Sequence, residues 1–129
     1  MAEGYVATKG NVEIFLKELK QILSTPKAQL NILPREDKIL EYSTEYCLRS
    51  LGFTTENVKE ELKKLEIKEY VECCPDERNH RSRDYYVFCK LYNKRQVYIK
   101  IKIQSYDNKI VLCMSFHYAE YKINKFPYK

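Results

Sequence analysis

Glycine and proline are scarce in this chain, and long apolar runs are absent from it. Its 129 residues include three glycines and four prolines, and no apolar run approaches the roughly 20 residues that a membrane-spanning helix needs. The opening MAEGYVATKG also lacks the hydrophobic stretch of a secretion signal. These absences argue against a linker, a low-complexity chain and a membrane protein. We therefore expect a cytoplasmic protein whose residues 1–129 form one domain around one core.

The cysteine count is odd, at five. An odd number does not suit a set of paired disulfides, and without an export signal reduced thiols are the simpler interpretation. Cys73, Cys74, His80 and Cys89 are residue types that bind zinc, but they contain no Cys-x-x-Cys pair and no convincing tetrahedral set. The sequence therefore predicts no metal ion and no other cofactor.

Charge is distributed unevenly along the chain. Residues 1–72 hold 11 lysines and arginines against 13 acidic residues, whereas residues 73–129 hold 12 against 5. A basic half that is also rich in tyrosine points to a polyanionic partner, with RNA or DNA first and an acidic protein second. The alternative is a basic surface that serves only solubility, and charge alone does not decide between them.

Apolar residues recur every three or four positions in the first half of the chain. This spacing predicts helices over 12–24, from about 36 to 51, and over 54–65. Asn11 is a candidate N-cap for the first helix, and Gly52 is a C-cap signal for the second.

The remaining segments of this half are shorter. Residues 66–72 predict a helical turn that extends the third helix. Residues 28–33, AQLNIL, predict a strand that Pro34 confines to a sheet edge. Residues 73–83, CCPDERNHRSR, predict a polar surface loop because they have nothing to bury.

Three strand-like segments follow, at 84–92, 95–104 and 109–117. Their short connections suit hairpin turns, so they predict an antiparallel meander. Its aliphatic face needs a cover, which the amphipathic helices supply. We therefore expect an α+β fold in which three to four helices pack on a small, mainly antiparallel sheet of three to four strands.

The middle strand separates two kinds of side chain. Its aliphatic residues share one face, and Tyr98, Lys100 and Lys102 share the other, because side chains alternate along a strand. In the last strand we expect Leu112, Met114 and Phe116 to face the core. His117 then emerges beside Tyr98, so that a phenol, ammonium groups and an imidazole lie on one open surface.

Such a surface can cleave RNA without a metal, because the nucleophile is the substrate's own 2′-OH. His117 suits the acid or base, since an unperturbed histidine titrates at about 6.5. Tyr98 suits a hydrogen bond to the substrate or the stacking of a base. Lys100, Lys102 and Arg95 suit stabilisation of the charge on phosphorus.

Plainer interpretations stand beside these. Exposed strand lysines usually protect an edge or aid solubility, and a lone histidine is more often structural than catalytic. Glu120, three residues after His117, is the candidate to orient it. The arginines of the polar loop, Arg78, Arg81 and Arg83, either grip a phosphate or are only solvated.

Two stretches resemble a known family. RQVYIKIKI followed by MSF, and LGFTTENVKEELKKLEIKEYVE at 51–72, are similar to the MqsR family of toxin ribonucleases from toxin–antitoxin pairs. The tail SFHYAEYKINKFPYK is similar to the longer, Gram-positive-type members, and the resemblance in element order extends over about 12–129. It implies a RelE-like fold, cleavage of mRNA and control by a neighbouring antitoxin.

The resemblance assigns site residues position by position. The tyrosine and lysine of the family's V-Y-[LI]-K-I strand fall on Tyr98 and Lys100, and the basic residue after Ser-Phe falls on His117. Two positions depart from the family: its lysine falls on Glu72 and its glutamine on Tyr85. Arg81, Arg83 or Lys90 are the candidates to replace the missing lysine.

The leading hypothesis is therefore a metal-independent endoribonuclease toxin with an mRNA substrate, a cognate antitoxin partner and no membrane association. His117, Tyr98 and Lys100 form its catalytic set, and further RNA contacts come from Lys90, Arg95, Lys102, Arg81 and Arg83. A homodimer is compatible with the sequence. The rivals are a module that binds RNA, DNA or protein without chemistry, and a structural or phage-borne interaction protein.

Overall fold

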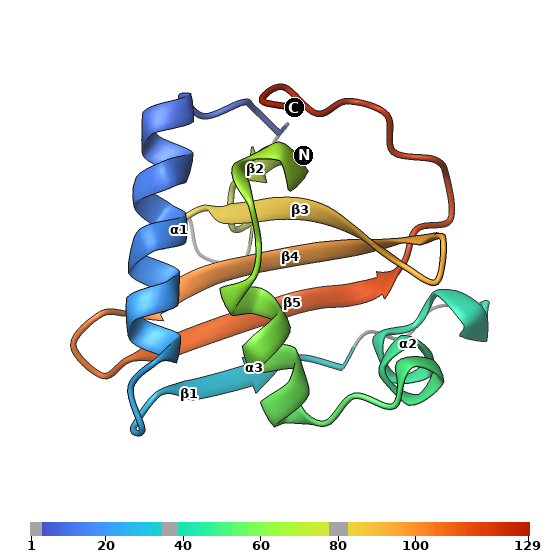
Figure 1. Ribbon diagram of the computed structural model, residues 1–129, viewed down its shortest axis with the longest axis horizontal. Helices are drawn as coiled ribbons and strands as arrows, with labels where there is room; N and C mark the ends of the chain where they lie inside the picture. Colours follow the sequence, from blue (N-terminus) through green and yellow to red (C-terminus); the bar gives the residue numbers. More distant parts are fainter. Residues whose placement is uncertain (1–3, 35–38, 78–82) are drawn as a thin grey trace.

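The computed structural model describes residues 4–34, 39–77 and 83–129, and these form three α-helices and one five-stranded sheet. The helices are α1 (Lys9–Leu23), α2 (Thr44–Leu51) and α3 (Thr55–Lys63). The strands are β1 (Gln29–Ile32), β2 (Tyr70–Cys74), β3 (Tyr85–Tyr92), β4 (Arg95–Ser105) and β5 (Ile110–Tyr118). Figure 1 shows α1 and α3 crossing the same face of the sheet. The α+β class is confirmed, and the likeness to RelE stays a prediction.

Helix α1 agrees with the prediction except at its start. It begins at Lys9 because the Thr8 side chain, rather than that of Asn11, is the N-cap and accepts a hydrogen bond from the Asn11 backbone N–H. Its apolar stripe, which includes Val12, Phe15 and Leu19, is buried. Among the described helices none is long and apolar enough to cross a membrane.

The second helix is shorter than predicted. A 3₁₀ turn, η1 (Leu40–Tyr42), comes first, and α2 begins after Ser43, whose side chain accepts from the Tyr46 N–H. Residues 35–38, which the prediction included, lie outside the described residues. The C-terminal end is as predicted, because Gly52 ends α2 with a φ of 71°, a left-handed conformation that glycine adopts without strain.

Beyond α3 the prediction is partly wrong. Thr54 and Asn57 close a capping box at the start of α3, and the helical turn after it is present as η2 (Ile67–Glu69). Residues 70–74, however, form strand β2 instead of a turn and a loop. They are held extended by pairing with β3 and by a bridge in which Tyr5 and Cys73 exchange backbone hydrogen bonds of 2.9 and 2.7 Å.

The sheet is larger than the predicted three to four strands. Its order is β1-β5-β4-β3-β2, with β1 parallel to β5 and every other pair antiparallel. The meander β3-β4-β5 is confirmed, and so is the edge position of β1. The fifth strand is β2, whose residues the sequence predicts as the end of a helical turn and the start of a loop.

A bulge in β5 changes which residues face the core. Lys100 pairs with Ser115 and Ile101 pairs with Cys113, so Met114 is an extra residue. Before the bulge, Val111 and Cys113 are fully buried beside the core residues of β4, and after it Phe116 takes over. The expectation that Leu112 and Met114 face the core is therefore wrong, while that for Phe116 is confirmed.

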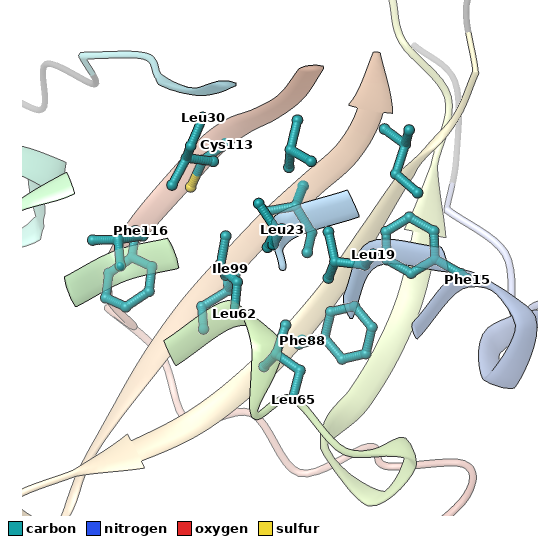
Figure 2. Close-up of a cluster of buried hydrophobic side chains, with 14 of the residues drawn as sticks. Phe15, Leu19, Leu23, Leu30, Leu62, Leu65, Phe88, Ile99, Cys113 and Phe116 are labelled. Carbon is teal, nitrogen blue, oxygen red and sulfur yellow. The ribbon is translucent and has the colours of Figure 1, made fainter. Parts of the chain in front are cut away.

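The core lies between the helices and one face of the sheet. Figure 2 shows Leu19 and Leu23 of α1 and Leu62 of α3 in one cluster with Ile99 of β4 and Phe88 of β3. All five side chains are at most 2% exposed. Burial of this kind stabilises the fold by about 1.5–3 kcal/mol per large side chain. This packing also holds β3, β4 and β5 in place, and so positions the side chains on their other face.

The last eleven residues, 119–129, form a segment that we call the C-terminal strap. The side-chain amide of Gln96 donates to the Ile123 carbonyl at 2.7 Å and accepts from the Ile123 N–H at 2.8 Å. Further along, Tyr128 donates to the Ala7 carbonyl and stacks on Tyr70 with ring centroids 5.8 Å apart. The strap thus runs past the strand ends and finishes beside the segment that leads into α1 (Figure 1).

Candidate functional site

The sheet has an outer face, which points away from α1 and α3. Cross-strand pairing places on it Tyr85 and Cys89 of β3, Tyr98, Lys100 and Lys102 of β4, and Ser115 and His117 of β5. The predicted grouping of Tyr98, Lys100 and His117 on one face is therefore confirmed. The predicted openness is wrong, because Lys102 is only 3% exposed and His117 only 8%.

Tyr98 and His117 form a pair at the centre of the candidate site. They are directly opposite in the β4–β5 register, and their rings stack with centroids 5.2 Å apart and planes 24° from parallel. His117 Nδ1 lies 2.9 Å from the Tyr118 carbonyl oxygen. Because a carbonyl only accepts, this contact places the proton on Nδ1 and leaves Nε2 as the basic nitrogen of the neutral ring.

A pocket of about 280 Å³ opens on this pair. Its other lining residues are Tyr42 and four residues of the C-terminal strap, Ala119, Glu120, Tyr121 and Ile123. Glu120 therefore lies near His117, as expected, but the Tyr118 carbonyl is the group at Nδ1. The orienting role of Glu120 stays a prediction. We call this space the Tyr98–His117 pocket.

Lys100 and Lys102 flank a third tyrosine on the outer face. Their Nζ atoms lie 5.1 and 4.7 Å from the centre of the Tyr85 ring, within the range of cation–π attraction. Lys102 also lies 2.5 Å from the buried Asp76 carboxylate. Lys102 is therefore part of a buried ion pair and does not offer an open ammonium to RNA, which corrects the expectation of an exposed lysine row. Lys100 remains partly exposed.

The two positions that depart from the family motif lie on the same face. Glu72 pairs with Val87, which pairs with Lys100, and Tyr85 is the residue under both lysines. Burial and then the Glu72 carboxylate raise the pKa of the neighbouring Cys74 thiol, against a lowering by Lys100. The resemblance places the family's lysine at Glu72, so this position carries a carboxylate side chain in place of an ammonium.

Three other predicted RNA contacts lie elsewhere. Arg95 sits 3.8 Å from the centre of the Tyr118 ring and 2.6 Å from Glu41. Lys90 is 3.6 Å from Glu69, and Arg83 lies over the Tyr106 ring. None of the three lines the Tyr98–His117 pocket. Arg81 lies outside the described residues.

The structure holds features that the sequence analysis missed. The strap supplies one wall of the pocket, and Asp76 is the partner of Lys102, although neither has a recognisable local motif. The five cysteines are free thiols. In the described part of the chain, no three histidine, cysteine or acidic side chains cluster as metal ligands, and His80 lies outside it.

Comparisons with known proteins identify a family. Neither the curated proteins nor the solved structures gave a match. A family model described as "Motility quorum-sensing regulator, toxin of MqsA" matches residues 16–118. This range begins within α1 and ends with the last residue of β5, so it includes Tyr98, Lys100 and His117 and omits the strap. The chain therefore belongs to the MqsR toxin family.

Proposed function

We propose that this toxin is an endoribonuclease that cleaves mRNA through the RNA's own 2′-OH and is neutralised by a cognate antitoxin. The observation that carries the proposal is the pairing of a stacked Tyr98 and His117 in one pocket, within the range that matches the toxin family. A family of toxins of MqsA implies an antitoxin partner. Self-association and a cytoplasmic location are further expectations.

In the proposed reaction His117 transfers protons. Neutral His117 takes the proton of the 2′-OH as the 2′-oxygen attacks phosphorus, the bond from phosphorus to the 5′-oxygen breaks, and the protonated His117 returns a proton to that oxygen. The products are a 2′,3′-cyclic phosphate and a 5′-hydroxyl. The hydrogen bond from Nδ1 to the Tyr118 carbonyl orients the ring, and Nε2 is the nitrogen that accepts the proton in this proposal. General acid–base catalysis of this kind contributes about 10²- to 10⁴-fold in rate.

Two further groups assist in the proposal. Lys100 lies on the same face two residues from Tyr98 and stabilises the negative charge that develops on phosphorus. Tyr98 donates its phenolic hydrogen to the substrate while its ring holds His117 in place. No metal ion takes part in this scheme, because each charge and proton is handled by a side chain.

One observation favours a second candidate, a module that binds RNA or protein without cleaving it. Glu72 puts a carboxylate where the family has a lysine, and a carboxylate repels the phosphate that a lysine attracts. If Lys100 does not compensate for this charge, the outer face binds RNA or protein but does not cleave RNA.

Incubation with a long mRNA in the presence of EDTA tests the proposal. Wild-type protein is compared with His117→Ala and His117→Gln, and the cut ends are mapped. We expect discrete cuts with 2′,3′-cyclic phosphate ends from wild type alone. Circular dichroism and thermal unfolding confirm that the variants are folded, which matters because His117 is buried.

The possible outcomes separate the two candidates. Equal cutting by a folded His117 variant removes His117 from the mechanism. Intact RNA with wild type, even when ribosomes are added, overturns the ribonuclease and favours the binding module. Cutting that EDTA abolishes contradicts the metal-independent reaction.

A further inference from the structure

A second hollow, larger than the Tyr98–His117 pocket, lies between β3 and the C-terminal strap. Its volume is about 690 Å³. We call it the strap groove, and its lining is Lys68, Glu69, Cys89, Lys90, Leu91, Gln96, Lys122, Ile123, Asn124, Phe126 and Lys129. The groove exists because β3 continues beyond its last pairing with β2, Tyr70 with Phe88, so that the strap borders this end of β3 instead.

Positive charge dominates the strap groove. Four lysines line it against one carboxylate, Glu69, which lies 3.6 Å from Lys90. Lys122 and Lys129 of the strap are exposed, and so is Lys68, whose side chain is 63% exposed. A concave surface lined in this way raises the local concentration of a polyanion.

The groove also offers apolar and aromatic surface. Phe126 is partly exposed in it, and the neighbouring Leu91 is 64% exposed. A single-stranded nucleic-acid site combines two elements. Lysines contact the phosphates of the nucleic-acid backbone, and an aromatic ring stacks on a base. An acidic protein segment would pair with the lysines but has no base to stack on the Phe126 ring, so the groove fits single-stranded RNA better.

The groove adjoins the Tyr98–His117 pocket. Ile123 lines both, and Cys89 in the groove is directly opposite Tyr98 in the β3–β4 register. Gln96 fixes this junction through its two hydrogen bonds to Ile123. Because the two hollows are neighbours, an RNA strand with its scissile phosphate at His117 is close enough to reach the lysines of the groove.

We infer that the strap groove binds the single-stranded RNA that flanks the cleavage position, through Lys122 and Lys129 together with Lys68 and Lys90. This inference rests on the proposed ribonuclease activity. It adds that the enzyme binds a longer stretch of RNA than the nucleotides at the cleavage position. It also gives Lys90 a role outside the pocket. Five of the eleven groove residues belong to the strap, which lies beyond the family match at 16–118.

Binding of an RNA that cannot be cleaved tests the inference separately from catalysis. A fully 2′-O-methylated 12-mer has no free 2′-OH, and fluorescence anisotropy gives its affinity at several salt concentrations. The test variant is Lys122→Ala with Lys129→Ala. The control is Lys17→Ala with Lys20→Ala, which removes the same charge from two exposed positions on α1.

We expect the control to bind like the wild type. The strap variant should bind at least about fivefold more weakly at low salt, and its plot of log affinity against log salt should be shallower by about 1.4, or about 0.7 for each lysine lost. A 2′-O-methylated 4-mer reaches only the pocket and should bind more weakly than the 12-mer. Its affinity should be the same for the strap variant and the control.

Equal affinities and slopes for the strap variant and the control overturn the strap groove, whether or not wild type cuts mRNA. Strap-dependent binding of the 12-mer by a protein that leaves mRNA intact supports the groove and overturns the ribonuclease. If a polyglutamate peptide binds as tightly as the 12-mer with the same dependence on the strap, the groove is a site for acidic protein, and the RNA assignment fails.

Discussion

Lys102 and Asp76 form a buried ion pair across the outer face of the sheet, with Nζ 2.5 Å from the carboxylate and both side chains at most 8% exposed. The pair ties the segment after β2 to β4. It also separates two lysines that look equivalent in sequence, since Lys100 is partly exposed. Lys102 therefore has a structural role at this face, and Lys100 is the lysine that we propose takes part in the reaction.

The first prediction concerns stability. Lys102→Met should lower the free energy of unfolding by about 3 kcal/mol, because it leaves the buried Asp76 carboxylate without its Lys102 partner. Lys100→Met is the matched control and should cost less than about 1 kcal/mol, because Lys100 is partly exposed and contacts the Tyr85 ring. Urea unfolding measures both. Equal losses would show that burial of the pair is not what stabilises this face.

The same two variants should reverse their order in RNA binding. Lys100→Met should make the salt dependence of binding shallower by about 0.7, the value for one lost phosphate contact on a single strand. Lys102→Met should leave that slope unchanged under conditions in which it is folded. Fluorescence anisotropy with an uncleavable oligonucleotide measures the slopes. An unchanged slope for Lys100→Met would reduce Lys100 to a surface charge.

The helices were largely predictable because their signals are local. The capping residues Thr54 and Gly52 lie next to the helix ends that they define. The start of α2 was missed, since apolar spacing continues through η1 and only the Ser43 hydrogen bond marks the true start. Periodicity shows that a helix exists better than it shows where the helix begins.

The strands depended on distant partners and were predicted less well. Nothing in YVECC indicates that β3 and Tyr5 will pair with it, and nothing near Met114 announces a bulge. The pairing of Tyr98 with His117 was still predicted, because simple alternation holds on that side of the bulge. The burial of Lys102 in an ion pair could not be predicted, because its partner Asp76 is 26 positions away in sequence.

The strap supports a prediction about local opening. Gln96→Ala removes two hydrogen bonds to Ile123, each of which contributes about 1 kcal/mol, so the strap should open at least about tenfold more often. Limited trypsin digestion at Lys122 and Lys125 measures this. Gln104→Ala, an exposed glutamine on the same strand, is the control. Equal digestion rates would show that other contacts hold the strap.

Alkaline pH should destabilise the fold. Burial raises the pKa of the Cys47 and Cys113 thiols to about 12, whereas thiols of an unfolded chain titrate near about 8.5. Between these values the unfolded state binds fewer protons than the folded state, so the free energy of unfolding falls as pH rises. The slope is at most about 1.4 kcal/mol per pH unit for each thiol.

Urea midpoints at pH 8, 9 and 10 measure this effect. The stabilising contribution should be almost fully present at pH 8, smaller at pH 9 and smaller again at pH 10. Cys47→Ala with Cys113→Ala should show a shallower decline, while Tyr70 and Tyr92, whose pKa burial also raises, continue to act above pH 10. An identical decline in the double variant would assign the effect to other groups, such as the Cys89 thiol, whose pKa burial raises to about 11.

Tyr98 has two separable properties, its ring and its hydroxyl. Tyr98→Phe keeps the ring that stacks on His117 at 5.2 Å and removes only the phenolic hydrogen-bond donor, whereas Tyr98→Ala removes both. If the hydroxyl donates to the substrate in the transition state, Tyr98→Phe should lower kcat about 100-fold with KM nearly unchanged. Steady-state cleavage of a short RNA measures this. Wild-type kcat for Tyr98→Phe together with a large loss for Tyr98→Ala would contradict donation by the hydroxyl, and Tyr98 would then act through its ring, by holding His117 and stacking a base.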